Sequence, residues 1–355
     1  MEHKRDPNRR KQCVSQMAGL FAFSILFSFL MLNLSACKKK TDKKTLQLFA
    51  LDTYVTITVE GKDAQEALDE AARLITDLEK ELSSRKENTP ISRLNASSEN
   101  APVTLPANAY GLLEKAWQYK NETEGVFDPR VAPLMDVWGF STGDPHVPSR
   151  EEIDAALSRV EEGGICFLDS CQAYVLPGTK IDLGGAAKGY IGDEVMRELK
   201  KFSLSRIILD LGGNITVWAE KDDLTVGIVD PKSPSVLCAV LHLSDCEIPQ
   251  SVITSGAYER YFEEDGIRYG HIMDPKTGYP VITDILSATV IGRDGAKGDI
   301  LSTTLYAMGK EKAMDWASQK GIDCVLCDEN GTLWVSSTLK GKIDAEKGWT
   351  IEYFD

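Results

Sequence analysis

The chain has 355 residues, a formal net charge of −14 and a hydrophobic fraction of 43%. This length and apolar content provide for a sizeable core and argue against a disordered chain. The acidic balance argues against a nucleic-acid partner, because a nucleic acid's phosphates select a basic surface.

The N-terminus has the pattern of a bacterial lipoprotein signal. Basic residues precede an apolar run over 17–32, which is shorter than the ~20 residues of a membrane-spanning helix. The run ends in LSAC (34–37), where small residues precede a cysteine. We predict a signal peptide over 1–36, lipidation of Cys37 and a polar, basic tether over 37–46. The alternative is an ordinary signal peptide with an incidental cysteine. The first interpretation places the protein outside the cytoplasm, anchored by lipid to the bacterial cell membrane.

The rest of the chain, 47–355, is predicted to be one folded domain. In its first part, alternating apolar residues predict a strand over 50–60, and apolar residues at helical spacing predict helices over 64–82 and 108–123. The polar stretch 83–100 is predicted to be an exposed loop. Further predictions cover two segments: 125–140 is non-helical because of Pro129 and Pro133, and 147–159 is a helix with a capping box from Ser149 to Glu152.

The second part alternates strands with helices. Helices are predicted over 190–201, 298–308 and 310–320. Strands are predicted over 173–181, 205–211, 224–228, 235–243, 271–274, 285–291, 324–326 and 333–336. Because the elements do not repeat as strict βαβ units, the pattern predicts an α+β or mixed α/β fold, with mixed sheets and flanking helices.

Six cysteines remain when Cys13 and Cys37 are set aside: Cys166, Cys171, Cys238, Cys246, Cys324 and Cys327. They are predicted to be disulfides of an oxidising envelope or buried structural thiols. Cys324 and Cys327 share a predicted strand, in which positions three apart point to opposite faces. No second CxxC or nearby histidine completes a zinc site.

One strand-to-helix corner, IDLGGAAKGYIGD (181–193), combines Asp182, two glycines and Lys188. Glycines let a backbone approach a ligand closely, and the N–H groups of a helix N-terminus favour anions. The corner therefore indicates a phosphate site, although a plain glycine-rich turn has the same composition. Further polar, glycine-flanked clusters follow other predicted strands, where α/β folds keep their sites.

In this arrangement the sequence resembles the FAD:protein FMN transferase (ApbE) family along nearly all of the predicted mature chain. Seven stretches carry the resemblance in the same order: SRLN (92–95), GVFDPRVAPLMDVWGF (125–140), IDLGGAAKGYIGD (181–193), DLGGN (210–214), TSGAYERYF (254–262), HIMDPKTGYP (271–280) and DILSTTLYAMG (299–309). The resemblance implies an ApbE-like fold with its site in a cleft between two lobes, and makes 47–355 an FMN transferase domain.

The activity that the resemblance implies is covalent flavinylation. The enzyme would cleave FAD, pass FMN to a threonine or serine hydroxyl of an exported acceptor flavoprotein, and release AMP. Such acceptors are subunits of membrane redox complexes. Two alternatives remain open: an FAD pyrophosphatase that yields FMN and AMP, and a lipoprotein that binds FAD without chemistry.

Phosphoryl transfer needs charge neutralisation and positioning, and Mg²⁺ prefers hard oxygen ligands shared with phosphate. Asp299 and Thr303 lie one helical turn apart and suit one metal ion. The resemblance adds the main-chain carbonyl of Gly185 or Ala186. Ser302, which stands where some relatives carry a second aspartate, is the further candidate metal ligand. Helix N-capping is the alternative role of Asp299.

The resemblance also assigns an FAD-binding set: Leu51, Arg85, Val126, Phe127, Asp128, Asp182, Lys188 and Ile272. Lys188 would neutralise phosphate charge, and Arg85 stands in place of a family aromatic residue. His271 is the candidate general base, because histidine titrates near neutral pH. Asp128 or a metal-bound hydroxide is the alternative base. With Lys188 and Asp299, His271 completes the predicted catalytic set.

Overall fold

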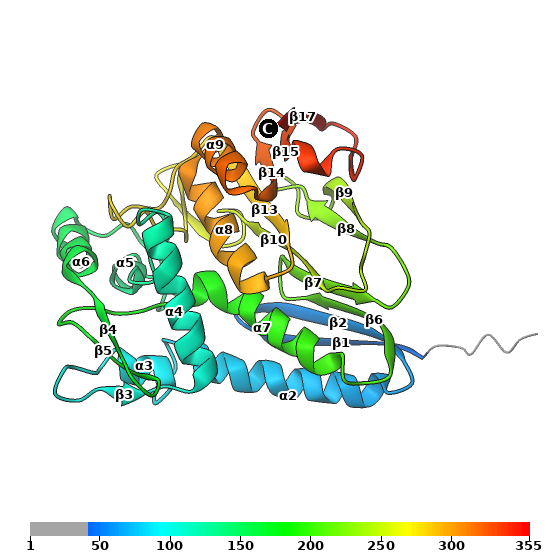
Figure 1. Cartoon of the computed structure of the whole chain (residues 1–355). Coiled ribbons are helices and arrows are strands. Elements are labelled where there is room, and N and C mark those ends of the chain that lie inside the picture. The colour runs from blue at the N-terminus through cyan, green and yellow to red at the C-terminus, as the bar shows by residue number, and fades with distance from the viewer. Residues whose placement is uncertain (1–41) are drawn as a thin grey trace, which may run out of the picture. The chain divides into compact units, whose positions relative to one another are not determined.

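A nine-stranded sheet runs through the part of the chain that the computed structural model describes, residues 42–355 (Figure 1). Neighbouring strands are antiparallel except for the last pair, which is parallel. In spatial order the strands are β1 (Lys43–Ala50), β2 (Thr53–Gly61), β6 (Leu204–Asp210), β7 (Asn214–Ala219), β10 (Gln250–Ser255), β13 (Ile285–Gly292), β14 (Asp323–Asp328), β15 (Thr332–Ser336) and β17 (Thr350–Phe354).

The sheet begins earlier than the predicted domain boundary. β1 pairs with β2 from Lys43 opposite Glu60 to Ala50 opposite Thr53. The last four residues of the predicted tether, 43–46, are therefore in the sheet. The predicted signal peptide and Cys37 lie outside the described residues.

Helices cover one face of the sheet (Figure 1). The first core cluster joins β1, β2 and β6 to α2 (Ala64–Leu82), α4 (Ala107–Glu122) and α7 (Gly184–Leu199). A further cluster joins β13 and β14 to α8 (Gly295–Met308) and α9 (Lys310–Lys320). The predicted helix over 64–82 is confirmed, because its apolar stripe packs on the strands.

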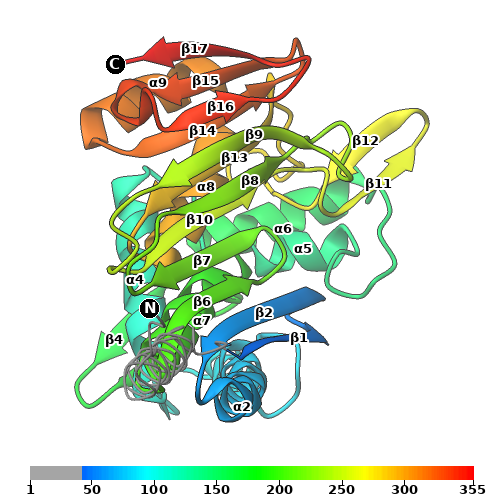
Figure 2. The same ribbon diagram turned by 90° about the vertical axis from the view of Figure 1, so that its right-hand side faces the viewer.

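A small sheet of β16 (Ile343–Ala345), β9 (Leu237–Leu243) and β8 (Leu224–Val229) packs against the opposite face (Figure 2). β14 is buried on both faces: Cys324 joins the cluster under the helices, and Cys327 joins the cluster under the small sheet. The predicted opposite orientation of these two cysteines is confirmed. All six cysteines of the described chain are free thiols, and the sulfur atoms of Cys238 and Cys327 are 3.8 Å apart.

The remaining elements surround this core. They are the helices α3 (Pro90–Leu94), α5 (Ala132–Val137) and α6 (Arg150–Glu162), the strands β3 (Val103–Thr104), β5 (Gln172–Val175) and β4 (Ile165–Leu168) of a second small sheet, the hairpin of β11 (Tyr261–Glu264) and β12 (Ile267–Gly270), and the turn η1 (Ser337–Leu339). The predicted capping box of α6 is confirmed, because the Ser149 side chain accepts from the Glu152 amide.

The prediction of an exposed loop over 83–100 is wrong, because the segment contains α3. Thr89 caps this helix, and the side chains of its residues Ile91 and Leu94 are fully buried. A single turn is too short to show helical periodicity in the sequence. At its end the Asn95 amide exchanges two hydrogen bonds with the backbone of Ile181.

The prediction that 125–140 is non-helical is also wrong. α5 tolerates Pro133 because this residue occupies the first helical turn, where no intrahelical N–H bond is needed.

Other predicted boundaries move. α7 begins at Gly184, six residues before the predicted start, because the glycine corner is itself the first turn of the helix. The strand predicted over 173–181 ends at Val175, and 271–274 holds only the isolated bridge of Met273 with Pro280. Within residues 42–355, no helix has both the length and the apolar character for crossing a bilayer.

α7 and α8 approach each other more closely than side chains allow. A Cβ atom on Gly189 would overlap the carbonyl oxygen of Gly295, and one on Gly295 would lie 2.5 Å from the carbonyl oxygen of Gly189. The Asp193 carboxylate, on α7, accepts hydrogen bonds from the amides of Gly295 and Ala296 at the start of α8. The two helices are therefore joined through their backbones.

We predict that Gly189→Ala separates α7 from α8 and lowers the free energy of unfolding by about 1–3 kcal/mol, the usual cost of overpacking. Thermal or urea denaturation measures this loss. Gly111→Ala is the matched control, because a Cβ atom at Gly111 in α4 meets nothing within 4 Å. The control is expected to be neutral or slightly stabilising, and equal effects of the two substitutions would contradict the prediction.

Candidate active site

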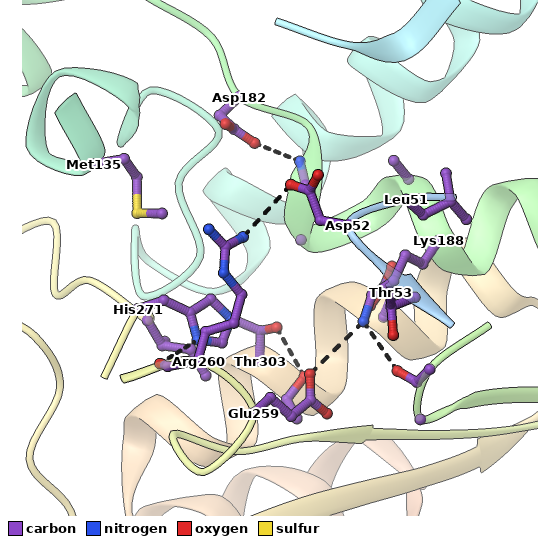
Figure 3. Close-up of a pocket in the computed structure, with 18 of the residues that line it drawn as sticks. Leu51, Asp52, Thr53, Met135, Asp182, Lys188, Glu259, Arg260, His271 and Thr303 are labelled. Atoms are coloured by element: carbon purple, nitrogen blue, oxygen red, sulfur yellow. Dashed lines mark hydrogen bonds and ion pairs between the residues drawn. The ribbon is translucent and has the colours of Figure 1, made fainter. Parts of the chain in front are cut away.

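A cavity of about 610 Å³ opens where three of the core clusters meet (Figure 3). Its size is typical of a cofactor or small-molecule site. Most of the predicted site residues line it: Leu51, Arg85, Val126, Phe127, Asp128, Asp182, Gly185, Lys188, His271, Ile272, Asp299 and Thr303. Ala186 and Ser302 do not.

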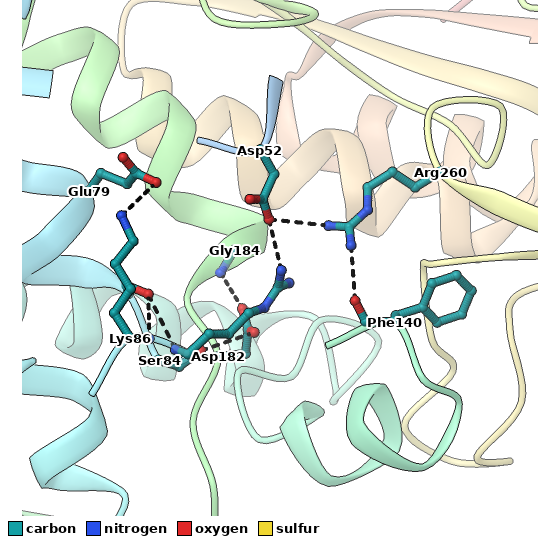
Figure 4. Close-up of polar contacts among 10 residues, drawn as sticks. Asp52, Glu79, Ser84, Lys86, Phe140, Asp182, Gly184 and Arg260 are labelled. Atoms are coloured by element: carbon teal, nitrogen blue, oxygen red, sulfur yellow. Dashed lines mark hydrogen bonds and ion pairs between the residues drawn. The ribbon is translucent and has the colours of Figure 1, made fainter. Parts of the chain in front are cut away.

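The glycine corner forms one wall of the cavity. The Asp182 carboxylate accepts a hydrogen bond from the Gly184 amide at 2.6 Å and one from the Ser84 hydroxyl at 3.3 Å (Figure 4). A Cβ atom at Gly185 would lie 3.0 Å from the Phe127 ring. The corner is therefore a helix start kept bare of side chains, which exposes its backbone to the cavity.

Asp299 projects from α8 toward this corner and is 3% exposed. One carboxylate oxygen accepts a hydrogen bond from the Gly189 amide at 3.0 Å. Burial raises the pKa of Asp299, and the nearby charge of Lys188 opposes that shift. The N-cap of α8 is Asp294, whose side chain accepts from the Lys297 amide, so N-capping is not the role of Asp299.

Thr303 lies one turn beyond Asp299 and also lines the cavity. Its hydroxyl is 3.1 Å from the Ser255 hydroxyl on β10. Ser302 is different: its fully buried hydroxyl donates to the Asp299 carbonyl and contacts Ser255. Ser302 does not line the cavity, and its hydroxyl is engaged by protein groups, so its role as a metal ligand stays a prediction.

The residues near Asp299 suit a hard cation. The Asp299 carboxylate and the Thr303 hydroxyl are oxygen donors, and the backbone of Gly185 lines the same cavity, whereas Ala186 is buried in the core. The buried side-chain amide of Asn214 lies beside the Asp299 carboxylate. Neither the nitrogen nor the oxygen of this amide is in hydrogen-bonding geometry with a partner. Within residues 42–355, no three His, Cys, Asp or Glu side chains form a metal cluster. This set suits Mg²⁺, which needs few carboxylates when phosphate shares the ion.

Lys188 lies at the centre of the cavity wall (Figure 3). Its ammonium donates to the Gly212 carbonyl at 3.3 Å and pairs with the Glu259 carboxylate at 3.8 Å. Glu259, which lies in TSGAYERYF, was not among the predicted site residues. Desolvation in the cavity raises the pKa of Glu259, and Lys188 opposes that shift.

His271 is held by the backbone of Arg260. The Arg260 carbonyl accepts from the His271 amide at 3.0 Å and lies 3.2 Å from Nδ1 of the ring. Because a carbonyl oxygen only accepts, Nδ1 carries the proton and Nε2 has the free lone pair. Burial, with the nearby charges of Arg260 and Lys188, lowers the pKa of His271 to about 4. The ring is therefore neutral near pH 7, with the Nε2 lone pair unprotonated.

Asp128, the alternative base, is committed to an ion pair. Its carboxylate is 2.6 Å from Nη2 and 2.9 Å from Nε of Arg130, and the Asp128 side chain is 3% exposed. Both carboxylate oxygens accept hydrogen bonds from the Arg130 guanidinium and are not free to contact a substrate hydroxyl. The geometry thus favours His271 over Asp128 as the base.

The rim of the cavity carries two arginines that share one acid (Figure 4). Asp52 lies in the β1–β2 turn, where it and Leu51 have positive φ. Its carboxylate is 2.8 Å from Arg85 and 3.9 Å from Arg260. The Arg85 side chain is thus engaged in an ion pair at the rim. Asp52 and Arg260 were not predicted, since nothing local in the sequence connects them.

Comparison with known proteins agrees with this geometry. The ApbE family model matches residues 51–326. The chain is 33% identical over 270 residues to the FAD:protein FMN transferase of Treponema pallidum, covering 70% of this chain and 72% of that protein. It is also 33% identical over 272 residues to the FAD:protein FMN transferase of Klebsiella pneumoniae, covering 75% and 83%.

A solved structure shares the fold. The ApbE protein of Thermotoga maritima superposes with a TM-score of 0.76 at 30% sequence identity, over 85% of this chain and 99% of that one. The predicted α+β architecture is confirmed. Because the family match covers most of the sequence, this chain belongs to the ApbE family of FAD:protein FMN transferases.

Proposed function

We propose that this enzyme transfers FMN from FAD to a threonine or serine hydroxyl of an exported acceptor flavoprotein, in a Mg²⁺-dependent reaction that releases AMP. The acceptor would be a subunit of a membrane redox complex, and the enzyme would be lipid-anchored at Cys37 outside the cytoplasm. One observation carries the proposal: Asp299, Thr303, Lys188 and His271 line a single cavity beside the bare first turn of α7.

In the proposed reaction the acceptor oxygen forms a bond to the FMN phosphorus, and the bond from that phosphorus to the AMP phosphate oxygen breaks. Nε2 of His271 takes the hydroxyl proton. The backbone at Gly185 and the Lys188 ammonium face the phosphates and neutralise their charge. Asp299 and Thr303 would hold Mg²⁺, which supplies further neutralisation of phosphate charge when bound.

The test is transfer of FMN to a flavoprotein subunit whose FMN attachment site is a threonine and is still free. The Thr→Val variant of this subunit is the control acceptor. The full chain is incubated in detergent with FAD and Mg²⁺, and covalent flavin is detected as fluorescence in a denaturing gel. Transfer to the threonine acceptor alone, with one AMP released per flavin attached, is expected. Release of FMN and AMP without an acceptor would identify a pyrophosphatase, and unchanged FAD would identify a binding protein.

Asp299→Asn is expected to lower the transfer rate at least about 100-fold, because it removes the buried negative charge that would hold the metal while keeping the side-chain shape. EDTA should have the same effect on the wild type. FAD binding, followed by flavin fluorescence, should largely survive. A substituted enzyme that keeps its Mg²⁺-dependent rate would exclude the proposed metal site.

His271 provides a pH test. Its pKa is lowered from 6.5 to about 4, so the folded protein keeps the ring neutral where an unfolded chain would protonate it. The associated stability is complete above about pH 6.5 and is lost as the pH falls toward 4. In an NMR titration, the histidine ring signal that His271→Asn removes should stay constant down to about pH 5. A midpoint near 6.5 would contradict this assignment.

A further inference from the structure

Among the acids that line the cavity, Glu259 and Asp299 both lie near the Lys188 ammonium. Lys188 precedes Gly189, whose amide is bonded to Asp299, so the lysine stem starts beside that carboxylate. The Lys188 ammonium nevertheless forms its ion pair with the Glu259 carboxylate, at 3.8 Å. In residues 42–355 no ion pair joins Lys188 to Asp299. The ammonium is therefore drawn toward one of two competing acids.

The surroundings of Glu259 favour this choice. The Gly212 carbonyl accepts a hydrogen bond from the Lys188 ammonium at 3.3 Å. Gly213 has φ +86°, and a Cβ atom there would lie 3.0 Å from a carboxylate oxygen of Glu259. Gly213 thus leaves the space that the Glu259 carboxylate occupies, and Gly212 contributes its carbonyl oxygen.

We propose that Glu259 is a positioning residue: it holds the Lys188 ammonium away from Asp299 and so keeps the Asp299 carboxylate free for a divalent cation. Lysine is a compact charge on a flexible stem, so without a fixed partner it pairs with the nearest acid. Removal of the Glu259 charge would let Lys188 occupy the place of the cation beside Asp299. This inference rests on the proposed function, because it presupposes a metal at Asp299.

The two acids differ in burial and in their hydrogen bonds. Asp299 is almost fully buried and is bonded to the Gly189 amide, whereas the Glu259 side chain is 24% exposed, within a cavity that is open to substrate. A Lys188–Asp299 pair would close the metal site. A Lys188–Glu259 pair keeps the ammonium on the cavity wall, where phosphates can approach it.

The experiment measures Mn²⁺ binding to the full chain in detergent by the loss of the free Mn²⁺ EPR signal, a readout independent of turnover. Wild type is expected to show one site that Asp299→Asn removes. Glu259→Gln should weaken this site at least about tenfold. Adding Lys188→Met to Glu259→Gln should restore the affinity to within about threefold of wild type, because the competing ammonium is gone.

Glu263→Gln is the matched control, since Glu263 is an exposed residue on β11 paired with Arg268; its Mn²⁺ affinity should equal that of wild type. An unchanged affinity in Glu259→Gln, or no recovery in the double variant, would overturn this inference alone. A wild type without an Asp299-dependent Mn²⁺ site would overturn the proposed metal site and this inference together. Thermal denaturation of each variant separates these outcomes from misfolding.

Discussion

The contact between α7 and α8 is the constraint on which the site depends. Two glycine backbones meet there, at Gly189 and Gly295, and Asp193 ties the start of α8 to α7. Asp299 follows one turn later, so the same contact brings its carboxylate to the Gly189 amide. Because protein interiors are close-packed, a small change in helix separation would remove the Asp299 carboxylate from the Gly189 amide.

The polar groups of the cavity are arranged in pairs. Lys188 is matched by Glu259, and Arg85 and Arg260 share Asp52. In an acidic protein that handles an anionic dinucleotide, paired cations keep a defined position and still offer hydrogen-bond donors to a phosphate. These ion pairs also join segments that are far apart in the chain. The same contacts therefore connect the elements of the fold and position the charged groups of the cavity.

One short segment after β10 orients two functional groups. The Glu259 side chain holds Lys188, and the neighbouring carbonyl of Arg260 sets the tautomer of His271. The Lys188 ammonium and the His271 ring are therefore positioned by adjacent residues. This coupling explains why TSGAYERYF belongs to the site although the sequence alone assigned no role to it.

The sequence by itself determined the long periodic helices and the α+β class, because these depend on residue types and on spacing within one element. Its ordered motifs gave the resemblance to the family, and that resemblance named many of the residues that line the cavity. Asp299 and Thr303 share a helix face at a spacing of four, and this was readable from the chain. The helix α3, the inward turn of Ser302 and the partner of Lys188 were decided only by the tertiary structure. Whether a side chain is buried, and which residue it pairs with, depends on which distant segment of the chain lies next to it. The local sequence pattern does not encode that neighbour.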